Sequence, residues 1–249
     1  SIFGEGTPMA SQSSFIFNYG MIKEGFHISS SQFALHYFFE SKAKLHGFMR
    51  NLSECSRLNG YFIGTCFDGD TVFQKLNNED GTFIVKKEKG NLCEIKRNYN
   101  RSIYKLPNDE TSINMSIDVT QHSIGHTIPE FLVSFEFLKT ILAKYGFEEL
   151  QNAELSAIEL TESSGLFSNL LSKFPNIRLS DAEKSISFMN RYFIFKKIRN
   201  TTTSELDNLF NEYDDNNNKT EKDERVEIEK CKKLSKKKYL LEEDAVDKM

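Results

Sequence analysis

Apolar positions in the first third of the chain change from strand-like to helix-like spacing and back. Residues 26–33 (FHISSSQF) are typical of a strand, and residues 34–56 carry apolar side chains at helical spacing. The helical face consists of Leu45, Phe48, Met49 and Leu52. Asn59-Gly60 is expected to end this helix, and residues 61–66 (YFIGTC) are expected to form a short apolar strand. The order predicts one strand–helix–strand unit.

The middle of the chain predicts short elements connected by turns. A turn at 68–70 leads into a helix over about 71–76, whose start has the carboxylates that a helix N-terminus favours. Three strand-like segments follow, at 82–87, 92–99 and 113–120, and turn-like sequences join them. We expect these three strands to form a small antiparallel insertion.

The pattern from Ile128-Pro129-Glu130 onward predicts a strong helix. Pro129 is expected in its first turn, where a proline costs no hydrogen bond, and Gly146 is expected to end it. Its apolar face would be formed by Phe131, Leu132, Phe135, Leu138, Ile141 and Leu142. The remaining elements expected are a strand at 147–150, a helix at 163–173, and a final strand at 187–198 with Phe193 and Phe195 on one side.

Alternating strands and helices followed by antiparallel strands indicate an α/β fold. We divide the chain into an irregular approach segment (1–25), a folded body (26–199) and a charged tail (200–249). The tail is expected to be disordered or to form a solvated helix, because about half of its residues are charged.

The formal net charge of −4 belongs entirely to the tail. Residues 201–249 carry 10 Lys/Arg and 14 Asp/Glu, whereas residues 1–200 carry 22 of each. The body is therefore neutral, and the overall charge is no argument against an anionic ligand.

The four cysteines are widely scattered and form no CxxC pair, which favours free thiols in a reducing compartment over a disulfide framework or a zinc cluster. No apolar run approaches the roughly 18 residues of a membrane-spanning helix, and the pattern of a signal peptide is absent from the sequence. We expect no membrane partner.

Taken singly, the titratable residues are weak evidence of catalysis. From spacing alone, His36 is more typical of a satisfied core or surface imidazole than of a ligand, and Glu130 at a predicted helix start is more typical of a carboxylate that compensates the helix dipole. Gly4-Glu5-Gly6 lacks the preceding strand and the further glycine of a phosphate loop. The segment 122–126 (HSIGH) has helical metal spacing in a strand-like context, so we expect no metal site.

Several segments in order carry more information than any single residue. The segments are SSQFALHYFFE (30–40), NGYFIGTCFDGD (59–70), PEFLVSFEFL (129–138) and KSISFMNRYFIFKK (184–197). Together they resemble the successive motifs of the mRNA cap guanine-N7 methyltransferases, in the style of the capping enzymes of large DNA viruses. The resemblance covers roughly residues 15–198.

The resemblance implies a Rossmann-like fold that uses S-adenosyl-L-methionine to methylate N7 of the cap guanosine of mRNA. It implies that Gln32, Phe33 and Tyr37 contact the cofactor. It also implies that His36, Tyr37 and Glu130 bind the cap guanine, with Glu130 accepting hydrogen bonds from the guanine N1 and amino donors.

A further aromatic residue of the family packs on the cap from the C-terminal strand. The register leaves Phe188 and Tyr192 as equal candidates for this position. No general base or metal is expected, because guanine N7 has a free lone pair and the sulfonium methyl is already activated.

Two features depart from the family pattern. The glycine-rich first cofactor motif is absent, so we expect a fold that is incomplete on its N-terminal side, and His27 stands where an Asp is common. The strand at 26–33 would then be an open sheet edge, and the isolated chain would bind the cofactor poorly.

The resemblance leaves alternatives for function and context. The chain could be a non-catalytic, methyltransferase-like partner or stimulatory subunit of a capping enzyme, or a methyltransferase for another substrate. Expected partners are the capped 5′ end of mRNA and triphosphatase or guanylyltransferase domains. The expected location is intracellular: a cytoplasmic virus factory or virion if the source is viral, and the nucleus if it is cellular.

Overall fold

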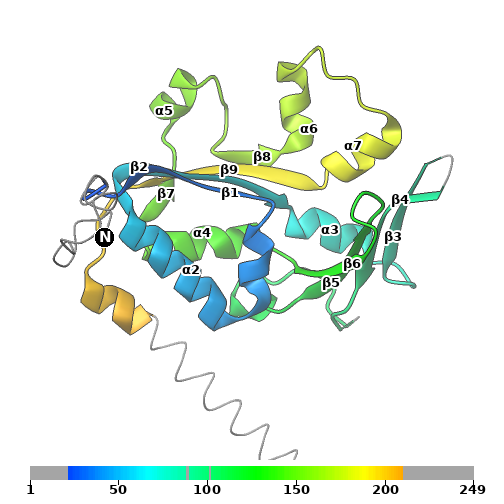
Figure 1. The fold of residues 1–249 in the computed structure, drawn as a ribbon, viewed down its shortest axis with the longest axis horizontal. Helices are drawn as coiled ribbons and strands as arrows, with labels where there is room; N and C mark the ends of the chain where they lie inside the picture. The colour runs from blue at the N-terminus through cyan, green and yellow to red at the C-terminus, as the bar shows by residue number, and fades with distance from the viewer. Residues whose placement is uncertain (1–21, 88–89, 101, 210–249) are drawn as a thin grey trace, which may run out of the picture.

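The structure, a computed structural model, describes residues 22–87, 90–100 and 102–209. Its strands form two sheets with helices packed against them (Figure 1). The predicted α/β class is confirmed. The predicted approach segment, up to residue 21, and the predicted tail beyond residue 209 lie outside the described residues.

The larger sheet has the strand order β1-β2-β9-β7, and β8 also pairs with β9. Its only parallel pair in the described part of the chain is β1 with β2, joined by a helical crossover. β1 is the terminal strand of this sheet, as expected. The strands are β1 (Phe26–Gln32), β2 (Ser56–Phe67), β7 (Phe147–Glu149), β8 (Ser164–Leu166) and β9 (Asn190–Lys197).

The smaller sheet is the predicted antiparallel insertion, with the order β3-β4-β5-β6. Its strands are β3 (Thr82–Lys87), β4 (Gly90–Arg97), β5 (Ser116–Gln121) and β6 (Thr127–Phe131). Three of them match the expected segments, and β6 was not expected as a strand.

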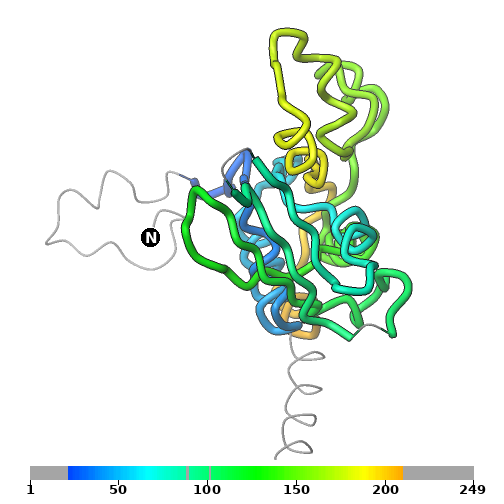
Figure 2. Tube along the Cα trace, turned by 90° about the vertical axis from the view of Figure 1, so that its right-hand side faces the viewer, coloured from blue at the N-terminus to red at the C-terminus, as the bar shows by residue number. Residues whose placement is uncertain are grey.

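The helices include α2, in the crossover from β1 to β2, and α4, which follows β6. They are η1 (Leu35–Glu40), α2 (Lys42–Cys55), α3 (Gly69–Lys75), η2 (Glu110–Ser112), α4 (Phe135–Lys144), α5 (Asn152–Ala157), α6 (Phe167–Leu170), η3 (Leu171–Lys173) and α7 (Asp181–Ser187). Figure 2 shows the segment between β7 and β9, coloured green-yellow to yellow, standing away from the rest of the body.

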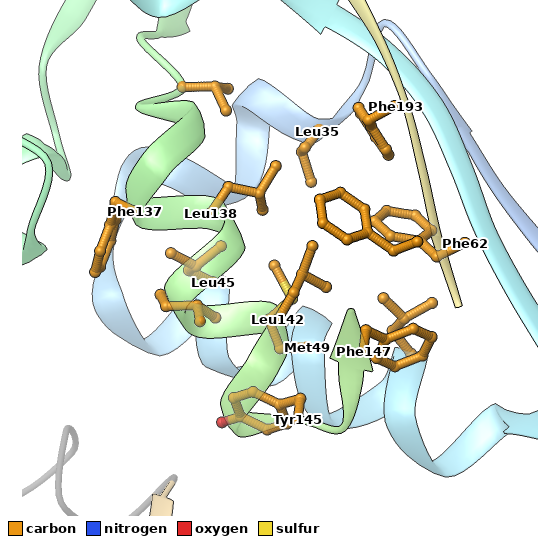
Figure 3. Close-up of a cluster of buried hydrophobic side chains, with 14 of the residues drawn as sticks. Leu35, Leu45, Met49, Phe62, Phe137, Leu138, Leu142, Tyr145, Phe147 and Phe193 are labelled. Carbon is orange, nitrogen blue, oxygen red and sulfur yellow. The ribbon is translucent and has the colours of Figure 1, made fainter. Parts of the chain in front are cut away.

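The main core lies between one face of the larger sheet and the helices α2 and α4 (Figure 3). Phe62, Phe193 and Phe195 point to this face, and each is at most 1% exposed. α2 contributes Met49 and α4 contributes Leu142, both fully buried. Burial of each such side chain stabilises the fold by about 1.5–3 kcal/mol. The common burial of Phe193 and Phe195 confirms the prediction that they lie on one side of the final strand.

The prediction that a helix begins at residues 128–130 is wrong. Pro129 and Glu130 lie in β6, and the helix begins only at Phe135 after the N-cap residue Ser134. A proline is tolerated in β6 because this strand is an edge of its sheet and pairs only with β5. The helical spacing from Phe135 onward was correct, and Gly146 follows the helix with a φ of 89°.

Three other boundaries also differ from the prediction. The helix α2 ends at Cys55, and Asn59, at φ 62°, lies within β2 at an irregularity of the β1–β2 pairing rather than at a helix end. The expected helix 163–173 is split into β8, α6 and η3. Ser187 belongs to α7, so the last strand begins at Asn190.

Candidate functional site

The carboxyl end of β1 carries the first group of candidate residues. Thr65 of β2 donates a hydrogen bond to Gln32 Oε1 at 2.8 Å, and Gln32 Nε2 donates to Ser30 Oγ at 3.0 Å. Phe33 follows with a φ of 50°, which is strained for a bulky residue, and its backbone N–H donates to the Thr65 carbonyl oxygen at 2.8 Å. The end of β1 is thus held by its neighbour β2 while Phe33 stays half exposed.

Helix η1 divides its side chains between core and solvent. Leu35 and Phe39 are fully buried in the main core and anchor this short helix. His36 is 4% exposed, whereas Tyr37 is 43% exposed, and the two ring centroids lie 4.1 Å apart in an edge-on arrangement. The Tyr37 side chain is therefore partly open to solvent beside the buried imidazole.

His36 meets Glu130, which reaches it from the other sheet. The distance from His36 Nε2 to Glu130 Oε2 is 3.6 Å, longer than a hydrogen bond. Within the described residues, His36 Nδ1, His36 Nε2 and Glu130 Oε2 are buried without any hydrogen-bond partner. Buried polar atoms are nearly always satisfied in native proteins, so these three atoms have hydrogen-bonding capacity that the described protein groups do not use.

Burial shifts both groups toward their neutral forms. It lowers the pKa of His36 from 6.5 to about 4 and raises the pKa of Glu130 from 4.5 to about 7. At neutral pH the imidazole is therefore uncharged, and the Glu130 carboxyl group is only partly ionised. A ligand that donates hydrogen bonds to Glu130 would favour its ionised form.

The structure brings together His36 and Tyr37 of η1, which follows the larger sheet's β1, and Glu130 of β6 in the smaller sheet. Gln32 is the last residue of β1, and Phe33 lies in the short connection from β1 to η1. The two candidates for the C-terminal aromatic differ in place. Tyr192 pairs with Thr65 across β2–β9, on the sheet face of Gln32, and Phe188 is the C-cap residue of α7.

A second group, which the sequence did not single out for the site, joins the end of β2 to the start of β9 and to the helices α3 and α4. Asp68, only 3% exposed, accepts hydrogen bonds from Thr71 and from Arg191 Nε at 2.6 Å. The Arg191 guanidinium also lies 4.5 Å from the ring centroid of Phe135, the first residue of α4. The sequence signal was the N-cap position of Asp68 in DGD, but nothing in the sequence indicated Arg191 as its partner.

Gly69 completes this junction. Its N–H donates to the Val133 carbonyl oxygen at 3.2 Å, and a β-carbon at this position would clash with that carbonyl group. Val133 follows Glu130 by three residues, so the close approach fixes the segment after β6 against the start of α3, which directly follows β2.

Two further observations concern what the described residues lack. They contain no cluster of three or more His, Cys, Asp or Glu side chains placed to bind a metal ion. In the same part of the chain, no helix is both long and apolar enough to span a bilayer.

Comparison with known proteins identifies the family. The model of the mRNA (guanine-N(7))-methyltransferase domain matches residues 13–229, so the chain belongs to this family. The chain is 28% identical over 134 residues to the mRNA cap guanine-N(7) methyltransferase of Aspergillus niger, a match that covers 50% of this chain and 19% of that protein. It is 23% identical over 215 residues to the probable mRNA-capping enzyme of Acanthamoeba polyphaga mimivirus, with 73% of this chain and 18% of that protein covered.

The chain spans about a fifth of the length of these two relatives. Among solved structures, the CcbJ methyltransferase of Streptomyces caelestis superimposes with a TM-score of 0.40 at 12% identity, over 70% of this chain and 62% of that one.

Proposed function

We propose that this domain binds the cap guanosine of mRNA and takes part in methyl transfer from S-adenosyl-L-methionine to its N7 atom. The buried, unpaired His36–Glu130 pair is the observation that carries the proposal. Guanine offers adjacent N1–H and amino donors, which complement a carboxylate, whereas adenine presents an acceptor at N1. The carboxylate of Glu130 would therefore favour guanine over adenine, because adenine would leave it without hydrogen-bond donors.

The protein residues supply position and environment in this proposal. Glu130 holds the donor edge of guanine, neutral His36 lies beside it, and the partly exposed ring of Tyr37 stacks on the base. When the base becomes cationic on N7 methylation, the ionised carboxylate and the aromatic face both bind it more strongly. No residue has to remove a proton from N7, because the attacking lone pair is already free.

Gln32, Phe33 and Tyr37 are the proposed contacts of the methyl donor. Gln32 is exposed at the carboxyl end of a parallel strand, the edge where α/β sheets bind their ligands, and the rings of Phe33 and Tyr37 are half exposed beside it. These polar and aromatic groups fit a nucleoside that carries a sulfonium group. S-Adenosyl-L-methionine supplies an activated methyl group to such a site.

The wider context is also part of the proposal. The mimivirus relative is named a probable mRNA-capping enzyme, and this chain covers 18% of it. We infer that the domain acts on the capped 5′ end of mRNA alongside triphosphatase and guanylyltransferase domains or a stimulatory subunit. Such a protein works inside the cell, in a virus factory or virion for a viral source and in the nucleus for a cellular one.

Nucleotide titrations of the full chain test the guanine site without requiring methyl transfer. We expect GTP and 7-methyl-GTP to bind at least tenfold more tightly than ATP, and Glu130→Gln to remove most of this preference. Glu136→Gln is the matched control, because this exposed carboxylate of α4 lies just beyond the same strand. Equal binding of ATP and GTP by the unaltered chain would refute the proposal.

A further inference from the structure

The carboxyl ends of β1, β2 and β8 lie at one edge of the larger sheet. β1 and β2 are parallel, and β8 runs in the same direction because β2 and β8 both pair antiparallel with β9. Phe33 is the first residue after β1, and Phe167 is the first residue after β8. The register shows that the two strands end level with each other, since one row across the sheet consists of Gln32, Thr65, Tyr192 and Gly165.

The rings of Phe33 and Phe167 meet across this edge. β1 and β8 are separated by β2 and β9, so their backbones lie three inter-strand spacings apart, about 14 Å at ~4.8 Å per spacing. The two ring centroids are nevertheless only 6.4 Å apart, and the ring planes are inclined at 72°. Two rings at this angle form an aromatic corner instead of a stacked pair.

Folding alone gives little reason for this aromatic corner. Phe33 has a φ of 50° and a ring that is 52% exposed, and strained backbone conformations of this kind cluster at ligand sites. The helix α6, which begins with Phe167, contains no buried residue. Neither ring belongs to the two clusters of buried hydrophobic side chains in the described part of the chain.

The position of Phe167 is fixed by the strand before it. The Ser163 carbonyl oxygen accepts a hydrogen bond from the Ile194 N–H at 2.7 Å, at the base of β8. Gly165 lies against the ring of Tyr192, where a β-carbon would come within 3.1 Å of the ring. These contacts hold the start of α6 against β9, so the aromatic corner is anchored on both of its sides.

The proposed donor contact Gln32 lies on the same side of the sheet as α6. Gln32, Tyr192 and Leu170 of α6 are among the residues that line a hollow of about 470 Å³. Figure 1 shows α6 on the side of the larger sheet opposite to α2 and α4. The Gln32 amide and the aromatic corner therefore border one region at the carboxyl edge of the sheet.

We propose that Phe167 is a further binding residue for the methyl donor, and that the Phe33–Phe167 corner binds the positively charged sulfonium group of that donor. The face of an aromatic ring attracts a cation, and inclined rings are a recurrent means of binding onium groups. This inference rests on the proposed function, since it takes S-adenosyl-L-methionine as the donor.

The charge on sulfur changes during the proposed reaction. The lone pair of guanine N7 forms the new bond to the methyl carbon, and the electron pair of the broken carbon–sulfur bond stays on sulfur. The sulfur becomes a neutral thioether, and the positive charge passes to the base. The aromatic corner should therefore bind the methyl donor more tightly than the demethylated product.

Comparison of S-adenosyl-L-methionine with S-adenosyl-L-homocysteine tests the aromatic corner, because the two compounds differ by one methyl group and the charge on sulfur. Ligand-observed NMR titrations of the full chain measure both affinities without methyl transfer. We expect the unaltered chain to bind S-adenosyl-L-methionine about fivefold more tightly, which corresponds to ~1 kcal/mol for a partly exposed cation–π contact.

Substitutions of Phe167 separate the ring face from simple packing. Phe167→Leu keeps apolar bulk but has no ring face, so this variant should bind the two compounds about equally. Phe167→Tyr should retain most of the preference. Tyr104→Leu is the matched control, because Tyr104 is an 84% exposed aromatic in the loop between β4 and η2 of the insertion, and it should leave the preference unchanged.

The outcomes separate this inference from the proposed guanine site. Equal affinity of the unaltered chain for the two compounds, or no affinity for either, would overturn the inference. A preference that persisted in Phe167→Leu, with both affinities reduced by the same factor, would also overturn it and show a packing role. A donor preference that depends on Phe167 would support the aromatic corner even if GTP and ATP bound equally, a result that would count only against the guanine site.

Discussion

The two sheets contribute to the candidate site in different ways. The larger sheet supplies residues that are consecutive in sequence, from Gln32 to Tyr37, at the end of its one described parallel pair. The insertion supplies a single inward-facing carboxylate, Glu130, from an edge strand. The comparison teaches that the proposed guanine pocket belongs to neither sheet alone and depends on the junction at Asp68 and Gly69, which follows β2 and contacts Arg191 of β9 and Val133 beyond β6.

The largest expected effect comes from breaking that contact. Asp68→Ala should lower the free energy of unfolding by about 3–4 kcal/mol, because it leaves the Arg191 guanidinium without its buried partner and removes the cap of α3. Urea denaturation is the measurement. Glu54→Ala removes one partner of the exposed Arg50–Glu54 pair and should cost less than about 1 kcal/mol. A similar cost for both variants would contradict the role of the junction.

The second effect concerns the pH dependence of stability. The folded-state pKa of Glu130, about 7, lies above its ordinary value of 4.5. The stability that protonated Glu130 contributes to the fold is therefore lost as pH rises from 4.5 to 7. The folded-state pKa of His36, about 4, lies below its ordinary value of 6.5. The stability that neutral His36 contributes to the fold is therefore lost as pH falls from 6.5 to 4. The two slopes oppose each other, and the unaltered chain should show little net dependence in this window from the pair.

Single substitutions should reveal each slope. In Glu130→Gln the stability should rise between pH 4 and 6.5, and in His36→Asn it should fall between pH 4.5 and 7, by on the order of 2–3 kcal/mol each. Thermal or urea unfolding at a series of pH values would show this. If neither variant changed the pH profile, the two groups would not be titrating as buried partners.

The third effect sharpens the link between ionisation and binding. Guanine donors need the carboxylate form of Glu130, so the affinity for GTP should fall up to tenfold per pH unit below about 7 and level off above it. Calorimetric titration between pH 5.5 and 8 would measure this, with Glu130→Gln as the pH-independent control. A flat profile in the unaltered chain would disconnect Glu130 from the ligand.

The smallest effect concerns the strained loop of the larger sheet. Phe33→Gly should stabilise the fold by about 1 kcal/mol, since glycine adopts a φ of 50° without strain. Ala34→Gly, at a φ of −131°, should instead destabilise by about 0.5–1 kcal/mol. Urea denaturation distinguishes the two, and a loss of stability in Phe33→Gly would show that the ring is needed for packing instead.

The sequence predicted the elements with one regularly buried face best, for a physical reason. Regular burial marks the larger sheet: the alternation at Phe193 and Phe195 and the helical spacing around Leu45 and Leu142 each follow from one buried face. Local spacing is enough to show such elements.

The error at Pro129 and Glu130 had a different origin. A proline followed by a helical pattern favours a helix start, and only the pairing with β5 shows that these residues form an edge strand. The same tertiary information was needed for the site. The resemblance proposed His36 and Glu130 as neighbours, but their burial, their 3.6 Å separation and the Asp68–Arg191 junction depend on contacts between distant segments.

The most direct test of the shared pocket is a double-mutant cycle between protein and ligand. Inosine triphosphate lacks the guanine amino group, so it should bind the unaltered chain about tenfold more weakly than GTP, whereas Glu130→Ala should bind both equally. This result would place the guanine donor edge at Glu130. A tenfold preference for GTP that persisted in Glu130→Ala would contradict the account.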